Sequence, residues 1–101
     1  MWVITMFDLP TDTKQARKAY ARFRGFLLED GFMMMQYSVY SRHCPSQENA
    51  DVHMQRIERN IPPDGEVRVL TLTDKQFERM QIFWGKIRKP PESPVKQLEF
   101  F

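Results

Sequence analysis

Two amphipathic helical segments, separated by one long alternating segment, constrain the fold of this chain more than any other feature. Apolar residues recur at helical spacing in both, as Ala16, Ala19, Tyr20, Phe23 and Leu27 in the first and as Ala50, Met54, Ile57 and Ile61 in the second. We expect Asp12 to cap the first helix in a capping box with Gln15, and Gly31 to end it. Pro45-Ser46 opens the second helix.

Segments typical of strands lie before, between and after these helices. The intervening segment, "FMMMQYSVYSR" from Phe32 to Arg42, predicts one long strand or two strands with a break near Gln36. Trp2 to Phe7 is rich in strand formers and is closed by Pro10. Further along the chain, Val67–Leu72 and Met80–Trp84 are predicted strands. "PPDG" is a predicted turn, and Thr73-Asp74 is expected to cap a short helical turn.

The order strand, helix, long strand, helix, strand indicates an α+β fold. Two amphipathic helices need a sheet face to cover, and a ferredoxin-like sandwich with the first strand near the sheet centre is the simplest arrangement. With 101 residues, of which 42% are hydrophobic and 28% charged, the chain suits one soluble domain. We place that domain at residues 1–88.

The C-terminal residues raise a separate question about assembly. Residues 89–94 form a Pro-rich linker, and residues 95–101, "VKQLEFF", alternate like one last strand. An apolar strand left unpaired would be prone to aggregation, so it pairs either with its own sheet or with the sheet of a partner. The stiff linker favours pairing with another protomer.

Charge and cysteine content restrict the cellular setting. The net charge is only +2, so any case for an anionic partner depends on where the charges lie. A single cysteine cannot form an internal disulfide, which fits a reducing compartment. Residues 1–7 lack a basic leader, and no apolar run approaches the roughly 20 residues needed to span a bilayer. These features predict a cytoplasmic protein without membrane partners.

Asp8 is the first candidate for chemistry. In "ITMFDLPTD" it follows the apolar run and precedes Leu-Pro, and such an aspartate commonly ends a strand and forms the turn. The same position also projects a carboxylate at the rim of the sheet, where it can bind Mg²⁺ if waters, substrate phosphates or a second copy of Asp8 complete the coordination. The residues alone leave both interpretations open.

A set of basic residues on the first helix is the second candidate. It consists of Lys14, Arg17, Lys18, Arg22 and Arg24. Solvated helix faces are usual, but such faces mix charges of both signs, whereas Thr13 to Phe26 contains no acid. Contact with nucleic-acid phosphates is the functional alternative.

The remaining residue patterns are weaker. His43, Cys44 and His53 do not match the four-ligand spacing of a structural zinc site. Ser38 and Ser41 have no base paired with them in the sequence, and the methionines of "FMMM" are best explained as core filling.

Three stretches together resemble the CRISPR-associated protein two family, the small proteins of the spacer-acquisition module. They are "MFDLPTDTKQARKAYARFRGFLLEDGF", "MQYSVYSR" and "VRVLTLTDKQFERM". The resemblance covers nearly the whole chain, is strongest from Ile4 to Arg42, and is closest to members associated with type II systems. Many members carry a basic residue two positions before the strand glutamine, where this chain has Met34.

The resemblance implies a ferredoxin-like homodimer whose C-terminal strand adds to the neighbouring protomer's sheet. One implied function is a Mg²⁺- or Mn²⁺-dependent endonuclease acting on RNA or DNA, with Asp8 as catalytic residue and metal ligand. The alternative is a non-catalytic scaffold that clamps duplex DNA between integrase dimers. The implied partners are a second copy of the chain, the CRISPR integrase subunit, double-stranded DNA and single-stranded RNA.

Overall fold

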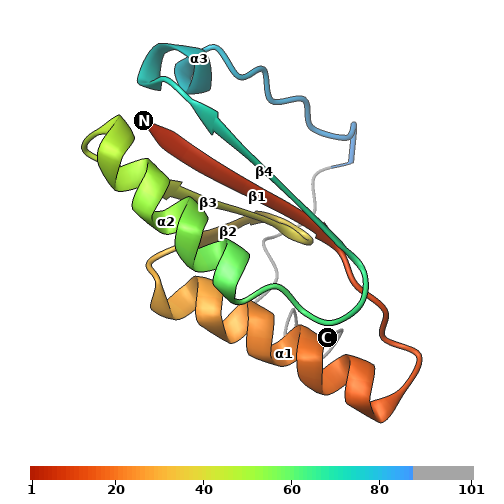
Figure 1. Ribbon diagram of the computed structural model, residues 1–101. Coiled ribbons are helices and arrows are strands. Elements are labelled where there is room, and N and C mark those ends of the chain that lie inside the picture. The colour runs from red at the N-terminus through yellow and green to blue at the C-terminus, as the bar shows by residue number, and fades with distance from the viewer. Residues whose placement is uncertain (88–101) are drawn as a thin grey trace.

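The computed structural model describes residues 1–87, which follow the order expected for a ferredoxin-like sandwich and end with a short helix (Figure 1). The elements are β1 (Trp2–Asp8), α1 (Lys14–Glu29), β2 (Met33–Gln36), β3 (Val39–His43), α2 (Gln47–Arg59), β4 (Glu66–Leu72) and α3 (Asp74–Glu78). The α+β class predicted from the sequence is confirmed.

The four strands form one sheet in the order β2-β3-β1-β4, and every neighbouring pair is antiparallel. The first strand therefore lies inside the sheet, as predicted. Its last residues pair with the first residues of β4, so that Met6 lies opposite Arg68 and Asp8 opposite Glu66. Opposed residues in an antiparallel pair share one face, which places these four side chains on the same side of the sheet.

The core lies between the sheet and the two long helices, which cover one sheet face (Figure 1). Val3 and Phe7 of β1 pack there against Tyr20, Phe23 and Leu27 of α1. Because side chains alternate along a strand, Ile4, Met6 and Asp8 point to the opposite face, which neither α1 nor α2 covers. We call this second surface the open face.

The helix boundaries correct one detail of the sequence analysis. The N-cap of α1 is Thr13 and not Asp12, because the Thr13 hydroxyl accepts a hydrogen bond of 3.0 Å from the Ala16 amide. Both residue types cap helices well, so the pattern located the cap only to within one position. The predicted caps at Ser46 and Thr73 are confirmed, and Gly31 follows α1 with φ +87°.

The long alternating segment forms a hairpin of two strands, with the predicted break after Gln36. Ser38, in the turn, has φ +59° and lies against the end of β1. Its carbonyl accepts a 3.1 Å hydrogen bond from the Phe7 amide, and its hydroxyl lies 3.2 Å from the Tyr20 hydroxyl. This turn therefore ties the Asp8 end of β1 to α1.

The strand predicted at Met80–Trp84 is wrong. Residues 80–85 have no strand geometry, and Ile82, Phe83 and Trp84 are exposed. The apolar composition signalled burial, but a strand also needs a neighbour to pair with, and no described strand pairs with this segment. The domain end at residue 88, the linker at 89–94 and the C-terminal strand at 95–101 lie outside the described residues.

A polar network that is buried at Asp30 and His53 joins α1, β3 and α2. The Asp30 carboxylate, at the end of α1, lies 2.6 Å from Nδ1 of His53 and accepts a 2.7 Å bond from Nη1 of Arg56. Nε of Arg42 donates to Nε2 of His53 at 3.0 Å, so Nε2 acts as acceptor and the ring proton lies on Nδ1, facing Asp30. We call these four residues the Asp30 network.

Candidate functional site

Asp8 lies at the exposed end of a central strand, at the edge of the open face. A hollow of about 260 Å³ surrounds it, lined by residues 6–8 of β1, residues 37–39 around the hairpin turn, and Glu66 and Arg68 of β4. We call this the Asp8 hollow. No hydrogen bond reaches the Asp8 carboxylate from the rest of residues 1–87. The carboxylate is therefore available to a ligand in one protomer.

The backbone under Asp8 is fixed by a turn that sequence analysis treated only as a connection. Gly65, with φ +92°, lies directly against β1, and a Cβ atom there would approach the Asp8 carbonyl oxygen to 2.7 Å. Glycine is needed both for the backbone conformation and for this close approach. The "PPDG" turn thus sets where β4 begins relative to Asp8.

Two charged residues of the hollow were not found from the sequence. Glu66 and Arg68 lie two positions apart on β4 and form an ion pair in which Arg68 Nε donates to the Glu66 carboxylate. Among the residues lining the hollow in the described part of the chain, Arg68 is the one cation. The pairing of β1 with β4 brings Glu66 opposite Asp8. Sequence analysis missed this neighbour because the register between two strands cannot be read from the sequence of either strand alone.

Hydroxyl groups at the hairpin turn adjoin the hollow. Burial raises the pKa of Tyr20 to about 12, and the neighbouring Tyr37 adds to this shift while the hydrogen bond from Ser38 opposes it. The Tyr37 side chain itself is 62% exposed at the hollow's rim. The side chains of Tyr37, Arg68 and Asp8 thus adjoin one hollow.

The basic residues predicted on α1 do not line this space. Lys14, Lys18 and Arg22 are exposed on the helix, and the Arg17 guanidinium donates 3.1 Å to the Thr11 carbonyl. Arg24 differs, since it is partly buried beside Tyr40, where its charge opposes the rise in the Tyr40 pKa caused by burial. The structure therefore separates the candidate carboxylate from the candidate basic surface.

The residues considered for zinc have other neighbours. Cys44 is fully buried, and burial raises its thiol pKa, while His53 belongs to the Asp30 network. Nε2 of His43 lies 3.2 Å from the Asp74 carboxylate. Within residues 1–87 no group of three or more His, Cys, Asp or Glu side chains could hold a metal ion.

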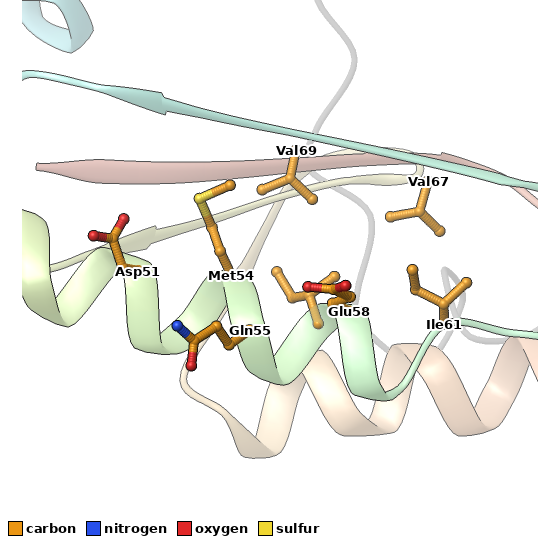
Figure 2. Close-up of a pocket in the computed structure, with 8 residues that line it drawn as sticks. Asp51, Met54, Gln55, Glu58, Ile61, Val67 and Val69 are labelled. Carbon is orange, nitrogen blue, oxygen red and sulfur yellow. The ribbon is translucent and has the colours of Figure 1, made fainter.

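A larger hollow than the Asp8 hollow lies between α2 and β4 (Figure 2). It measures about 480 Å³, and Met54, Val67 and Val69 point into it, with Asp51 and Glu58 among the residues around it. Its charged groups are acidic and, unlike the Asp8 hollow with Arg68, it has no cation among its described lining residues, which disfavours a phosphate ligand. The Asp8 hollow remains the candidate for phosphate chemistry.

Fold and site together define a class of protein: a small ferredoxin-like domain with a carboxylate at the end of its central strand and a basic first helix. Residues 1–80 match the family model described as CRISPR associated protein Cas2, and the chain belongs to this family. None of the helices within residues 1–87 has the length and apolar character needed to span a lipid bilayer.

Relatives named "CRISPR-associated endoribonuclease Cas2" cover the whole chain. The protein of Parvibaculum lavamentivorans is 63% identical over 101 residues, which is 100% of both chains. That of Flavobacterium psychrophilum is 46% identical over 100% of this chain and 88% of its own.

Solved structures agree with the fold. The crystal structure of Streptococcus pyogenes Cas2 at pH 6.5 matches with a TM-score of 0.61 and 21% identity, covering 83% of this chain and 100% of that one. A second structure, described as a crystal structure of Cas2, gives a TM-score of 0.59 at 22% identity, covering 92% and 95%.

Proposed function

We propose that this protein acts in the acquisition of new CRISPR spacers and is a metal-dependent endonuclease that cleaves RNA or DNA at Asp8. Membership of the family and the names of its relatives support the role. The observation that carries the catalytic part is the exposed Asp8 carboxylate in a hollow that also contains the Arg68 guanidinium. A carboxylate for a metal and a cation for a phosphate are the two charges that phosphodiester hydrolysis uses.

The donor groups suit one kind of metal site. Glu66 is already paired with Arg68, so one protomer offers Asp8 as its available carboxylate in the hollow. Mg²⁺ keeps several waters and is commonly held by one or two carboxylates and substrate phosphates, which fits Asp8 and its copy in a second protomer. When bound, Mg²⁺ or Mn²⁺ supplies a Lewis acid that polarises the phosphate and lowers the pKa of an attacking water.

The open face supports the proposal of a homodimer. Ile4 is buried on this face, but Leu70, which lies opposite it, is 38% exposed, and Met33 is 73% exposed. An apolar sheet face of this kind is normally covered, and a second copy of the chain would cover it while bringing two Asp8 residues toward one axis. Exchange of the C-terminal strand at residues 95–101 stays a prediction.

The catalytic proposal is tested with Asp8→Asn, which keeps the shape of the side chain and removes its charge. We expect Mg²⁺-dependent cleavage of a fluorescent oligonucleotide to fall on the order of 100-fold, as for loss of one group that stabilises a transition state. In the wild type the rate should rise with pH, because the attacking water must lose a proton.

Asp12→Asn is the matched control, since Asp12 is exposed and does not line the Asp8 hollow. It should cleave like the wild type. Circular dichroism should show both variants folded. Full-rate cleavage by folded Asp8→Asn would place the activity at another site and reject the proposal.

A second candidate function is a non-catalytic scaffold that holds duplex DNA between integrase dimers. It is favoured by α1, where Lys14, Lys18 and Arg22 are exposed and the helix has no acid in its first turn or through Phe26. A helical stretch that carries cations and no acids can contact phosphates without reading bases. This function needs no metal and would survive loss of Asp8.

Charge reversal on α1 tests the scaffold. The double variant Lys18→Glu, Arg22→Glu should weaken binding to every duplex and reduce the log–log salt slope by about one unit for each phosphate that α1 no longer neutralises. Arg59→Glu, Lys86→Glu changes the net charge equally at exposed positions off α1 and should bind nearly as the wild type does. Equal weakening in the two double variants would show that net charge, and not α1, governs binding.

A further inference from the structure

The chain contains two Asp-Gly dipeptides, Asp30-Gly31 and Asp64-Gly65, in different surroundings. Asp-Gly is a dipeptide at which a chain readily modifies itself, because glycine has no side chain to hinder attack by its own amide nitrogen on the preceding carboxyl group. The product is an isoaspartyl linkage, in which the main chain runs through the aspartate side chain. The two dipeptides therefore form a matched pair in which the fold decides where this reaction occurs.

Asp64-Gly65 lies in the exposed turn before β4, and its two reacting groups are in contact. Oδ1 of Asp64 accepts a hydrogen bond of 2.8 Å from the Gly65 amide, which holds the carboxyl group beside the nitrogen that attacks it. Both residues are exposed, so the water needed for the later hydrolysis reaches them. The folded turn thus brings together the groups that react.

Asp30-Gly31 is kept from the same reaction by the Asp30 network. The Asp30 carboxylate is 8% exposed and lies 2.6 Å from His53 and 2.7 Å from Arg56. The Gly31 amide donates instead to the Leu28 carbonyl at 3.1 Å. Both reacting groups are bonded elsewhere, so ring closure here must wait until this end of α1 opens locally.

We propose that Asp64-Gly65 is a self-modification site, at which the folded chain forms an isoaspartyl linkage, and that the Asp30 network protects Asp30-Gly31. The Gly65 nitrogen forms a bond to Cγ of Asp64, and the amide proton and the carboxyl hydroxyl leave together as one water, which closes a succinimide ring. A water molecule then adds to the main-chain carbonyl carbon of Asp64 and breaks the bond from that carbon to the nitrogen. The chain gains and loses one water overall, and a free α-carboxylate remains.

The new linkage changes the backbone that lies against Asp8. It lengthens the main chain ahead of Gly65 by the Cβ atom of Asp64. A carbon added to Gly65 itself would approach the Asp8 carbonyl oxygen and Cδ2 of Leu9 to 2.7 Å each, so this turn has no space for a longer backbone. The start of β4 must therefore move away from the end of β1, where Glu66 lies opposite Asp8. Modification loosens this end of the sheet whether or not Asp8 is catalytic.

Ageing of the folded protein at neutral pH, followed by comparison of its tryptic peptides, tests the proposal. Trypsin releases the two dipeptides separately, in residues 25–42 and 60–68. Peptide 60–68 should acquire an isoaspartyl isomer, detected by its shifted retention and by an isoaspartyl methyltransferase. Peptide 25–42 should convert more than about tenfold more slowly, because it needs local opening. In urea both should convert at comparable rates. Comparable conversion in the folded protein, or conversion of 60–68 only after unfolding, would overturn the proposal.

Two variants separate the modification from other effects of ageing. Asp64→Glu would have to close a larger ring and should stay unmodified, so its urea midpoint should not change on ageing, whereas the midpoint of the wild type should fall as isoaspartate accumulates. Asp64→Asn closes the same ring with loss of ammonia and should convert faster than the wild type. An equal fall of the midpoint in aged wild type and Asp64→Glu would reject the link between the modification and the Asp8 end of the sheet. Failure of folded Asp64→Asn to convert would mean that the turn forbids ring closure, and the site would be wrong.

Discussion

Asp8 and Asp30 each lie at the end of a regular element and have an arginine close by, but their surroundings differ. Asp30 uses both carboxylate oxygens, one toward His53 and one toward Arg56, and its side chain is 8% exposed. Asp8 is exposed, and the neighbouring arginine is paired with Glu66 instead. A carboxylate whose bonding capacity is filled by its own chain holds the fold together, whereas one left open to solvent can serve a ligand.

The largest expected effect is loss of stability in Asp30→Asn. The amide turns one oxygen acceptor into a donor, which then faces either the His53 Nδ1 proton or the Arg56 guanidinium. This mismatch at a side chain that is 8% exposed should cost about 3 kcal/mol, the upper end for an unsatisfied buried polar group. Urea unfolding followed by circular dichroism, at one protein concentration, measures the change.

Asp8→Asn is the matched comparison, and its free energy of unfolding should stay within about 0.5 kcal/mol of the wild type, as for ordinary surface changes. A destabilisation as large as that of Asp30→Asn would mean that Asp8 also stabilises the fold. The contrast between the two aspartates would then be wrong.

A smaller effect concerns Tyr20, a buried polar group close to the Asp8 end of the sheet. Its pKa is raised from 10.0 to about 12, so the folded state disfavours the ionised hydroxyl. The stability that this group contributes is complete below pH 10, the unfolded pKa, and is lost as the pH rises toward 12. The total decrease should be about 2 to 3 kcal/mol, at about 1.36 kcal/mol for each pKa unit.

Tyr20→Phe should remove this part of the alkaline destabilisation. At neutral pH the variant should be slightly less stable, because the hydrogen bond to Ser38 is absent. Urea midpoints of the two proteins at several pH values between about 8 and 12, the range that spans both pKa values, should therefore converge or cross. Parallel curves would show that Tyr20 is not the titrating group.

The order of elements could be predicted because apolar residues recur with a different spacing in helices and in strands, and because the helices begin at recognisable capping residues. Ser46 and Thr73 cap their helices as expected, and the break after Gln36 separates β2 from β3. The failure at Met80–Trp84 has a different cause, since apolar composition indicates burial but does not identify the surface that provides it.

The site was predicted only in part. Asp8 could be singled out because its position at a strand end is a local property of the sequence. Arg68 and Glu66 could not, because their place beside Asp8 depends on the pairing of β1 with β4 across about sixty residues. His53 was considered only as a metal ligand, since its partners Asp30 and Arg42 come from other elements.

The smallest expected effect on stability comes from the ion pair of the hollow itself. Arg68 and Glu66 are 74% and 61% exposed in their side chains, and exposed pairs contribute about 0 to 1 kcal/mol. Arg68→Ala should therefore change the free energy of unfolding by less than about 0.5 kcal/mol, while Arg56→Ala, which leaves the buried Asp30 with one partner fewer, should cost more. Arg56 and Arg68 are both surface residues bonded to a carboxylate. The difference between the two losses of unfolding free energy therefore measures the effect of burying the carboxylate. Urea midpoints of the two variants in parallel measure it, and equal destabilisation would show that burial of the acid does not separate the two regions.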